Sequence, residues 1–126
     1  MPLIIFADDD PLLGDVVRGV LSEAGHVVGL VQDGASAVRA ITLKRPDLAI
    51  LDVMMPGLGG IEAVRQIRAC AEVHSMPILM LSARSNQSDV EIAIRAGADD
   101  YLKKPFDPDM LVARVERLLA GRRRNF

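Results

Sequence analysis

The sequence has no tryptophan, one tyrosine and one cysteine, Cys70, among its 126 residues. A single cysteine excludes an internal disulfide and a cysteine-based metal site. No apolar stretch approaches the roughly 20 residues of a membrane span, and the N-terminus lacks the pattern of a signal peptide. A net charge of −2 gives no reason to expect a membrane or nucleic-acid surface. We therefore expect a cytoplasmic domain without direct nucleic-acid or membrane contact.

Aliphatic residues are abundant. Hydrophobic residues make up 50% of the chain and aromatic residues only 3%, so the core must be built from Val, Ile, Leu, Ala and Met. This length suits one domain with one closed core. We expect the domain to cover residues 1–121. Residues 122–126 are expected to be a basic C-terminal tail or the start of a truncated linker.

Short apolar runs alternate five times with segments of helical periodicity. In the first helical segment, Asp10 is expected to act as the cap and Pro11 as the first residue. In the segment 87–96, the spacing predicts that Val90, Ala93 and Ile94 face inward. The alternation indicates an α/β fold with a parallel sheet covered on both faces. The strands are expected at residues 3–7, 27–31, 48–51, 77–81 and 99–102.

Asp52 directly follows the buried strand expected at 48–51. Residues 56–60 after it include one proline and three glycines, which impose a tight and irregular path. A carboxylate at a strand end, followed by a constrained loop, is a candidate site for chemistry. Taken alone, Asp52 is better explained as a turn carboxylate that hydrogen-bonds nearby backbone N–H groups, so its role depends on the other strand ends.

Four of the five expected strands are followed by polar residues: Asp8 and Asp9, Asp52, Ser82 and Lys104. In a parallel sheet these residues gather at one edge, where open α/β sheets bind ligands. Three carboxylates at one edge repel each other unless a cation such as Mg²⁺ neutralises them. Lys104 and Ser82 are suited to hold the oxygens of a phosphoryl group. The pattern therefore predicts phosphoryl transfer onto or off a carboxylate, which would form an acyl phosphate.

These motifs, in this order and spacing, resemble the receiver domain of two-component response regulators over residues 3–120. The resemblance implies a doubly wound five-stranded parallel sheet of order 2-1-3-4-5 with five helices, as in flavodoxin-like and CheY-like proteins. It also implies a phosphorylation-dependent switch rather than an enzyme. The motifs are Asp8-Asp9, Asp52 with Pro56-Gly57, Ser82-Ala83 and residues 101–106.

By the same resemblance, Asp52 is the phosphoacceptor for a sensor histidine kinase. Asp9 matches the direct Mg²⁺ ligand, Asp8 a ligand that usually acts through water, and Met54 a ligand through its backbone carbonyl. Asp52 completes this metal set.

The resemblance assigns further roles around the acceptor. Ser82 matches the hydroxyl that turns toward the phosphoryl group, and Lys104 matches the lysine that pairs with that group. Tyr101 matches the aromatic switch that follows the hydroxyl. Pro105 would follow a cis peptide bond, as it does in this family.

Residues 97–119 look most like receivers of winged-helix transcription factors, which often form homodimers through the fourth helix, fifth strand and fifth helix on phosphorylation. Asp100 and Arg114 match one ion pair of that interface. Val90 and Met110 stand where Arg and Glu usually form another, so a contact between them would be apolar and less sensitive to salt. Any DNA contact would belong to another domain.

Alternative interpretations remain open. A haloacid-dehalogenase-like phosphatase would use Asp8 as the acceptor, although Leu12 stands where that family has Thr or Val, and Asp52 would have no role. A dinucleotide site is weaker, because Glu62 replaces the third glycine after Gly57-Leu58-Gly59. A third class is a pseudo-receiver that serves only as an interaction module.

Overall fold

The computed structural model describes residues 1–84 and 86–124, without the side chains of 122–124. Over these residues the chain alternates five strands with five helices, as the sequence predicted. Strands β3, β4 and β5 end one residue later than expected, so that Asp52 and Ser82 are the last residues of their strands. The elements are β1 (Leu3–Ala7), α1 (Pro11–Glu23), β2 (Val27–Val31), α2 (Gly34–Lys44), β3 (Leu48–Asp52), α3 (Gly60–Ala69), β4 (Ile78–Ser82), α4 (Gln87–Ala96), β5 (Asp100–Lys103) and α5 (Pro108–Arg124).

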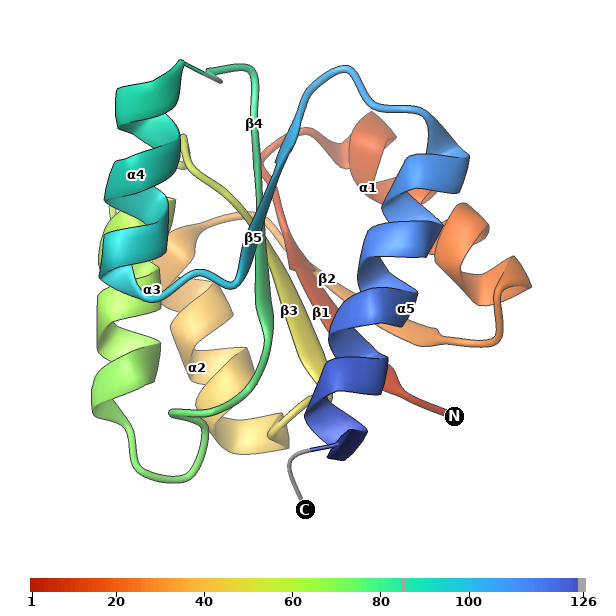
Figure 1. The fold of residues 1–126 in the computed structure, drawn as a ribbon, viewed down its shortest axis with the longest axis horizontal. Coiled ribbons are helices and arrows are strands. Elements are labelled where there is room, and N and C mark those ends of the chain that lie inside the picture. Colours follow the sequence, from red (N-terminus) through yellow and green to blue (C-terminus); the bar gives the residue numbers. More distant parts are fainter. Residues whose placement is uncertain (85, 125–126) are drawn as a thin grey trace.

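The strands form one parallel sheet in the order β2-β1-β3-β4-β5. Helices α2, α3 and α4 cover one face, and α1 and α5 cover the other (Figure 1). This is the doubly wound topology that the resemblance implied. The strand order reverses between β1 and β3, which places the carboxyl ends of these two strands side by side.

Two hydrophobic clusters fill the space between the sheet and its two helical layers. Strands β3 and β4 are buried along their whole length and serve both clusters. Ile50 and Leu79 point to the α1–α5 side, whereas their neighbours Leu51 and Met80 point to the α2–α3 side. Alternate residues of a strand face opposite ways, which explains why these strands are apolar throughout.

Helix α1 begins as its sequence predicted. Asp10 is the cap, and its side chain accepts hydrogen bonds from the backbone N–H groups of Leu12 and Leu13. Pro11 occupies the first turn, where its missing N–H has no intrahelical partner to lose. The cap fixes the direction in which the chain leaves the loop that carries Asp8 and Asp9.

Helix α4 lies differently from what its periodicity indicated. Among the ten residues of α4, all of them described, Ala93 is the buried one. Val90 is half-buried, but Ile94 is 45% exposed, so the prediction that it faces inward was wrong. Successive helical residues are about 100° apart, and burying Ala93 therefore turns Ile94 away from the core.

Helix α5 continues to Arg124, past the domain boundary expected at residue 121. Residues 125 and 126 of the expected tail lie outside the described residues. No described helix combines the length and the hydropathy that crossing a membrane requires.

Candidate functional site

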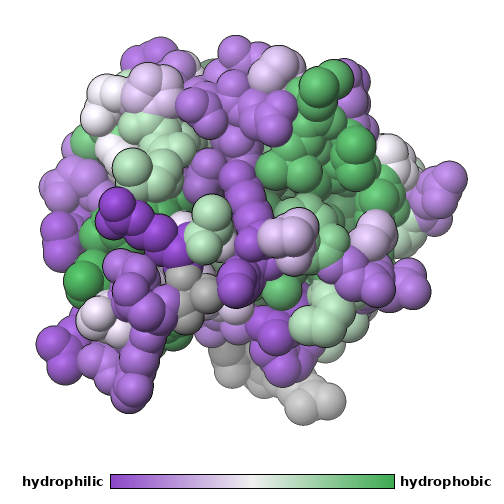
Figure 2. Space-filling model, turned by 90° about the horizontal axis from the view of Figure 1, so that it is seen from above, coloured by the Kyte–Doolittle hydropathy of each residue, from purple (hydrophilic) through white to green (hydrophobic). Residues whose placement is uncertain are grey.

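Polar side chains meet at the carboxyl edge of the sheet, as the sequence predicted. Asp52 and Ser82 end β3 and β4, and Asp8 and Asp9 follow β1. The backbone N–H of Lys104 donates to the carbonyl of Ser82 at 2.8 Å, which brings the residue after β5 to the same edge. Figure 2 looks down on this end of the molecule and shows hydrophilic residues across its middle.

Lys104 joins the two buried carboxylates. Its Nζ lies 2.6 Å from Asp8 Oδ2 and 3.1 Å from Asp52 Oδ2, so one ammonium group serves both. The peptide bond between Lys104 and Pro105 is cis, as the resemblance implied. The acceptor candidate, its acidic neighbour and the lysine therefore form one hydrogen-bonded group.

The charges of this group are not balanced. Burial raises the pKa of Asp52 above its usual range, and the negative charge of Asp8 adds to the effect, whereas the hydrogen bond and charge of Lys104 oppose it. Burial alone would lower the pKa of Lys104, but its hydrogen bonds to Asp8 and Asp52 outweigh burial and raise that pKa. The site thus has more negative charge than its single lysine compensates.

A divalent cation fits this imbalance. One carboxylate oxygen each from Asp8, Asp9 and Asp52 lie within 4.8 Å of one another. Hard oxygen ligands of this kind suit Mg²⁺, which keeps several waters that a phosphoryl oxygen can replace. The backbone N–H of Met54 donates to Asp52 Oδ1 at 3.3 Å, so this loop residue also reaches the acceptor. A ligand role for the carbonyl of Met54 stays a prediction.

The loop after Asp52 is held tightly, as its glycines predicted. A Cβ atom on Gly60 would lie 2.1 Å from the carbonyl oxygen of Asp52 itself. A Cβ atom on Gly34, at the start of α2, would lie 1.9 Å from the carbonyl oxygen of Leu58. The loop is therefore confined between the starts of α2 and α3, where a residue larger than glycine would displace backbone.

A second set of hydrogen bonds connects Ser82, beside the acceptor, with Tyr101 on β5. The buried Ser82 accepts a hydrogen bond through Oγ from the backbone N–H of Arg84, at 3.0 Å. The carbonyl of the same Arg84 accepts a hydrogen bond from the hydroxyl of Tyr101. The backbone of Arg84 thus links the hydroxyl and the ring that the resemblance paired. Sequence reasoning missed this role, because a backbone contact leaves no signal in residue type.

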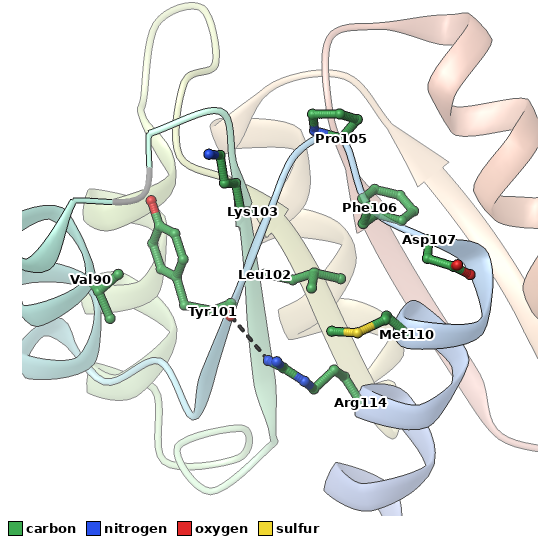
Figure 3. Close-up of a pocket in the computed structure, with 9 residues that line it drawn as sticks. All are labelled: Val90, Tyr101, Leu102, Lys103, Pro105, Phe106, Asp107, Met110 and Arg114. Carbon is green, nitrogen blue, oxygen red and sulfur yellow. Dashed lines mark hydrogen bonds between the residues drawn. The ribbon is translucent and has the colours of Figure 1, made fainter.

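The residues expected at the dimer face share one surface. Val90, Met110 and Arg114 line a groove of about 450 Å³ together with Tyr101 (Figure 3). Asp100 pairs within the chain with Arg114 at 3.0 Å, and with Arg117 at 2.6 Å. The groove lies between α4 and α5 along β5.

Known proteins show the same pattern. Residues 4–116 match the family described as the response regulator receiver domain. The chain is 41% identical to the transcriptional regulatory protein CseB of Streptomyces avermitilis and 43% identical to the DNA-binding response regulator MtrA of Mycolicibacterium smegmatis. Each match covers 92% of this chain but only 48% and 50% of the relatives. The chain therefore spans about half the length of these curated relatives.

Solved structures agree on the fold. The receiver domain of a sensor histidine kinase from Pseudomonas aeruginosa PAO1 superposes with a TM-score of 0.88 and 35% sequence identity, over 94% of this chain and 98% of that one. That protein was crystallised with a magnesium ion coordinated in its active-site cleft.

Proposed function

Because the chain belongs to the family of response regulator receiver domains, we propose that Asp52 accepts a phosphoryl group from a sensor histidine kinase in a Mg²⁺-dependent reaction. The observation that carries this proposal is the position of Lys104 Nζ, between Asp8 and Asp52 and beside a cluster of three carboxylates. A donor of this kind draws on ATP, so the domain would act in the cytoplasm.

The side chains divide the chemistry. A carboxylate oxygen of Asp52 attacks the phosphorus, the bond from phosphorus to the donor nitrogen breaks, and an acyl phosphate forms. Mg²⁺, when bound by Asp8, Asp9 and Asp52, would supply positive charge to the transferring oxygens. Lys104 is held where its ammonium can move from the carboxylate to a phosphoryl oxygen.

The protonation state of Asp52 matters for this reaction, because only the carboxylate is a nucleophile. Burial works against ionisation, and Lys104 works for it. A cation at the carboxylate cluster would favour ionisation further, so acceptance of the phosphoryl group would depend on the metal. The phosphoryl group ends on the protein itself, which makes the domain a signalling switch rather than a catalyst of a substrate.

We propose that Ser82 and Tyr101 pass the change on. A phosphoryl group on Asp52 would draw the hydroxyl of Ser82 toward its oxygens and away from the N–H of Arg84. That movement would alter the carbonyl of Arg84, to which Tyr101 is hydrogen-bonded. The population of two arrangements of the α4–β5–α5 face would shift as a result.

The kinase needs a surface on which to dock. An apolar pocket of about 350 Å³ lies beside Lys104 and is lined by Leu13, Val16 and Phe106. Figure 2 shows hydrophobic residues gathered on the side of α1, where Leu12 is 76% exposed. An apolar area next to the acceptor suits a protein donor.

We expect Leu12→Lys to slow phosphorylation by a kinase that accepts the native protein, and to leave phosphorylation by acetyl phosphate unchanged. Equal kinase rates would contradict this docking surface.

We propose a homodimer through the α4–β5–α5 face of the phosphorylated domain. Val90 and Met110 would make its apolar contact, and the pair Asp100–Arg114 would exchange partners across the two copies. Analytical ultracentrifugation with beryllofluoride and Mg²⁺ should detect a dimer that persists in high salt and is lost in Met110→Glu. A monomer in the native protein under these conditions would refute the proposal.

Intact mass after incubation with acetyl phosphate tests the central assignment. We expect one phosphoryl group that requires Mg²⁺, is labile to base and is absent from Asp52→Asn. Asp10→Asn is the matched control, since Asp10 caps α1 and Asn can replace it there. A phosphoryl group that persists in Asp52→Asn would move the acceptor to another residue, with Asp8 first. No modification of the native protein would favour an interaction module that has lost the reaction.

A further inference from the structure

Arg68 lies in the last turn of α3, at the opposite end of the sheet from Asp52. Its guanidinium group spans two loops that are distant in sequence. Its Nε donates to the carbonyl of Gly97 at 2.9 Å, and its other nitrogens reach the carbonyls of His74 at 2.8 Å and Met76 at 2.6 Å and the carboxylate of Asp99 at 2.9 Å. The planar fork of arginine suits such a set of acceptors, and a lysine could not reproduce it.

These contacts fix the carboxyl-terminal end of α4. Gly97 is the cap of this helix, and a Cβ atom on it would lie 2.7 Å from Cγ of Arg68. Asp99 also accepts from the backbone N–H of Ile78 at 2.8 Å, and its own N–H donates to the carbonyl of Ile78 at 2.9 Å. Through Arg68, the end of α3, the start of β4 and the turn after α4 form one hydrogen-bonded unit.

The rest of α4 is held more weakly. Each of α1, α2 and α3 buries three or more residues, whereas α4, over its described length, buries Ala93 alone. Before the amino-terminal end of α4, the chain is held by the backbone of Arg84, which joins Ser82 and Tyr101. One end of α4 is therefore anchored to α3, and the other end lies next to the groups proposed to switch.

We infer that Arg68 is a positioning residue that makes the carboxyl-terminal end of α4 a pivot. The inference rests on the proposed function and concerns how its signal reaches the surface. Helix α4 has ten residues and is about 15 Å long, so a rigid helix fixed at Gly97 moves most at Gln87 and least at Arg95. A change at Ser82 and Tyr101 then tilts α4 about its carboxyl-terminal end. Without Arg68, that end is no longer fixed, and the same change would move both ends of the helix by similar distances.

Distance measurements between spin labels test this gradient. In a Cys70→Ser background, Leu43→Cys on α2 is paired with Gln87→Cys in one protein and with Arg95→Cys in another; all three labelled positions are exposed. On addition of Mg²⁺ and beryllofluoride, we expect the distance change at position 87 to exceed that at position 95 by at least twofold. In Arg68→Gln, we expect the two changes to become equal.

Arg65→Gln is the matched control. Arg65 lies one turn earlier on α3, is 57% exposed and pairs with Glu62 at 3.2 Å. It should keep the gradient. Tyr101 is the sole tyrosine and the sequence has no tryptophan, so intrinsic fluorescence reports the site in every variant. We expect the fluorescence change to occur in Arg68→Gln at beryllofluoride concentrations within twofold of the native protein.

The outcomes separate the two proposals. If the distance change at position 87 still exceeds that at position 95 in Arg68→Gln, and only the melting temperature is lowered, Arg68 contributes to stability alone and the inference is overturned. A native protein that neither accepts a phosphoryl group in the intact-mass measurement nor changes its fluorescence would instead remove the proposed function, and the inference with it. If Arg68→Gln does not fold, Arg68→Lys keeps the charge beside Asp99 but cannot reproduce the set of hydrogen bonds to Gly97, His74 and Met76. An unchanged gradient in that variant would overturn the pivot, and a reduced gradient would support it.

Discussion

Buried charge is compensated differently at the two ends of the sheet. At the carboxyl end, one ammonium group is shared by Asp8 and Asp52, with the carboxylate of Asp9 beside them. At the amino end, one guanidinium group has a carboxylate and three carbonyl groups as acceptors. The side chains of Lys104 and Arg68 are 21% and 20% exposed, so the difference lies in their partners and not in their burial.

This difference links the carboxyl end with function and the amino end with stability. At the amino end, the charge of Arg68 is paired with Asp99, and its other donors are taken up by backbone carbonyls. The carboxyl end leaves Asp52 with a raised pKa and the site with negative charge in excess, which a bound metal ion would compensate. Functional sites commonly carry such local strain, and the rest of the fold compensates for it. We therefore expect substitutions at the two ends to change stability in opposite directions.

The largest effect is expected at the amino end. Arg68→Ala would leave the carboxylate of Asp99 without its counter-charge and the carbonyls of Gly97 and Met76 without the donors of Arg68, and should lower the free energy of unfolding by about 3 kcal/mol. Urea denaturation measures this change. Arg65→Ala, on the exposed side of the same helix, should stay within about 0.5 kcal/mol of the native protein. Equal losses in the two variants would remove the contrast between the ends.

Mg²⁺ should stabilise the carboxyl end specifically. At a concentration 100 times its dissociation constant, a ligand that binds only the folded state raises the free energy of unfolding by about 2.7 kcal/mol. We expect this increment to be lost in Asp9→Asn and kept in Asp10→Asn, because Asp10 caps α1. Thermal denaturation with and without Mg²⁺ measures it.

The same increment should appear in Arg68→Ala, because distant sites contribute additively. An increment that shrinks in Arg68→Ala would show that the two ends are coupled in the resting protein.

The sequence predicted the carboxyl end far better than the amino end. Strand ends in a parallel sheet meet at one edge, so Asp8, Asp9, Asp52 and Lys104 could be grouped once the alternation of elements was read. Arg68 gave no such signal. Its acceptors are mostly backbone carbonyls of two loops, and residue types do not record where a carbonyl points.

The same limit explains the errors around α4. Its periodicity was correct, but spacing alone does not say which side of a short amphipathic helix is buried when a small residue such as Ala93 can make the contact. Ile94 was therefore assigned to the wrong side. The link from Ser82 through Arg84 to Tyr101 depends on the path of a loop, and sequence patterns predict loop paths least well.

The smallest effect has the opposite sign. Without metal at pH 7, Asp52→Asn should raise the free energy of unfolding by about 1 kcal/mol, because it removes a buried charge whose partner, Lys104, keeps Asp8. The pKa of Asp52 is raised in the folded protein, so the folded state binds the proton more tightly than the unfolded state does. Its contribution to stability therefore falls as pH rises from the unfolded value near 3.8 through the folded value.

Chemical denaturation across that pH window tests the sign. Asp52→Asn should lose the fall in stability that Asp52 causes. Asp33 should show the opposite pH dependence. Hydrogen bonds from the backbone and side chain of Ser36 lower the pKa of Asp33, so its contribution to stability grows as pH rises. Asp33→Asn should therefore lose a rise in stability with pH. If Asp52→Asn destabilised the protein at pH 7, the carboxyl end would be a satisfied charge network like the contacts of Arg68. The excess negative charge would then not be what makes this end ready to bind a metal ion.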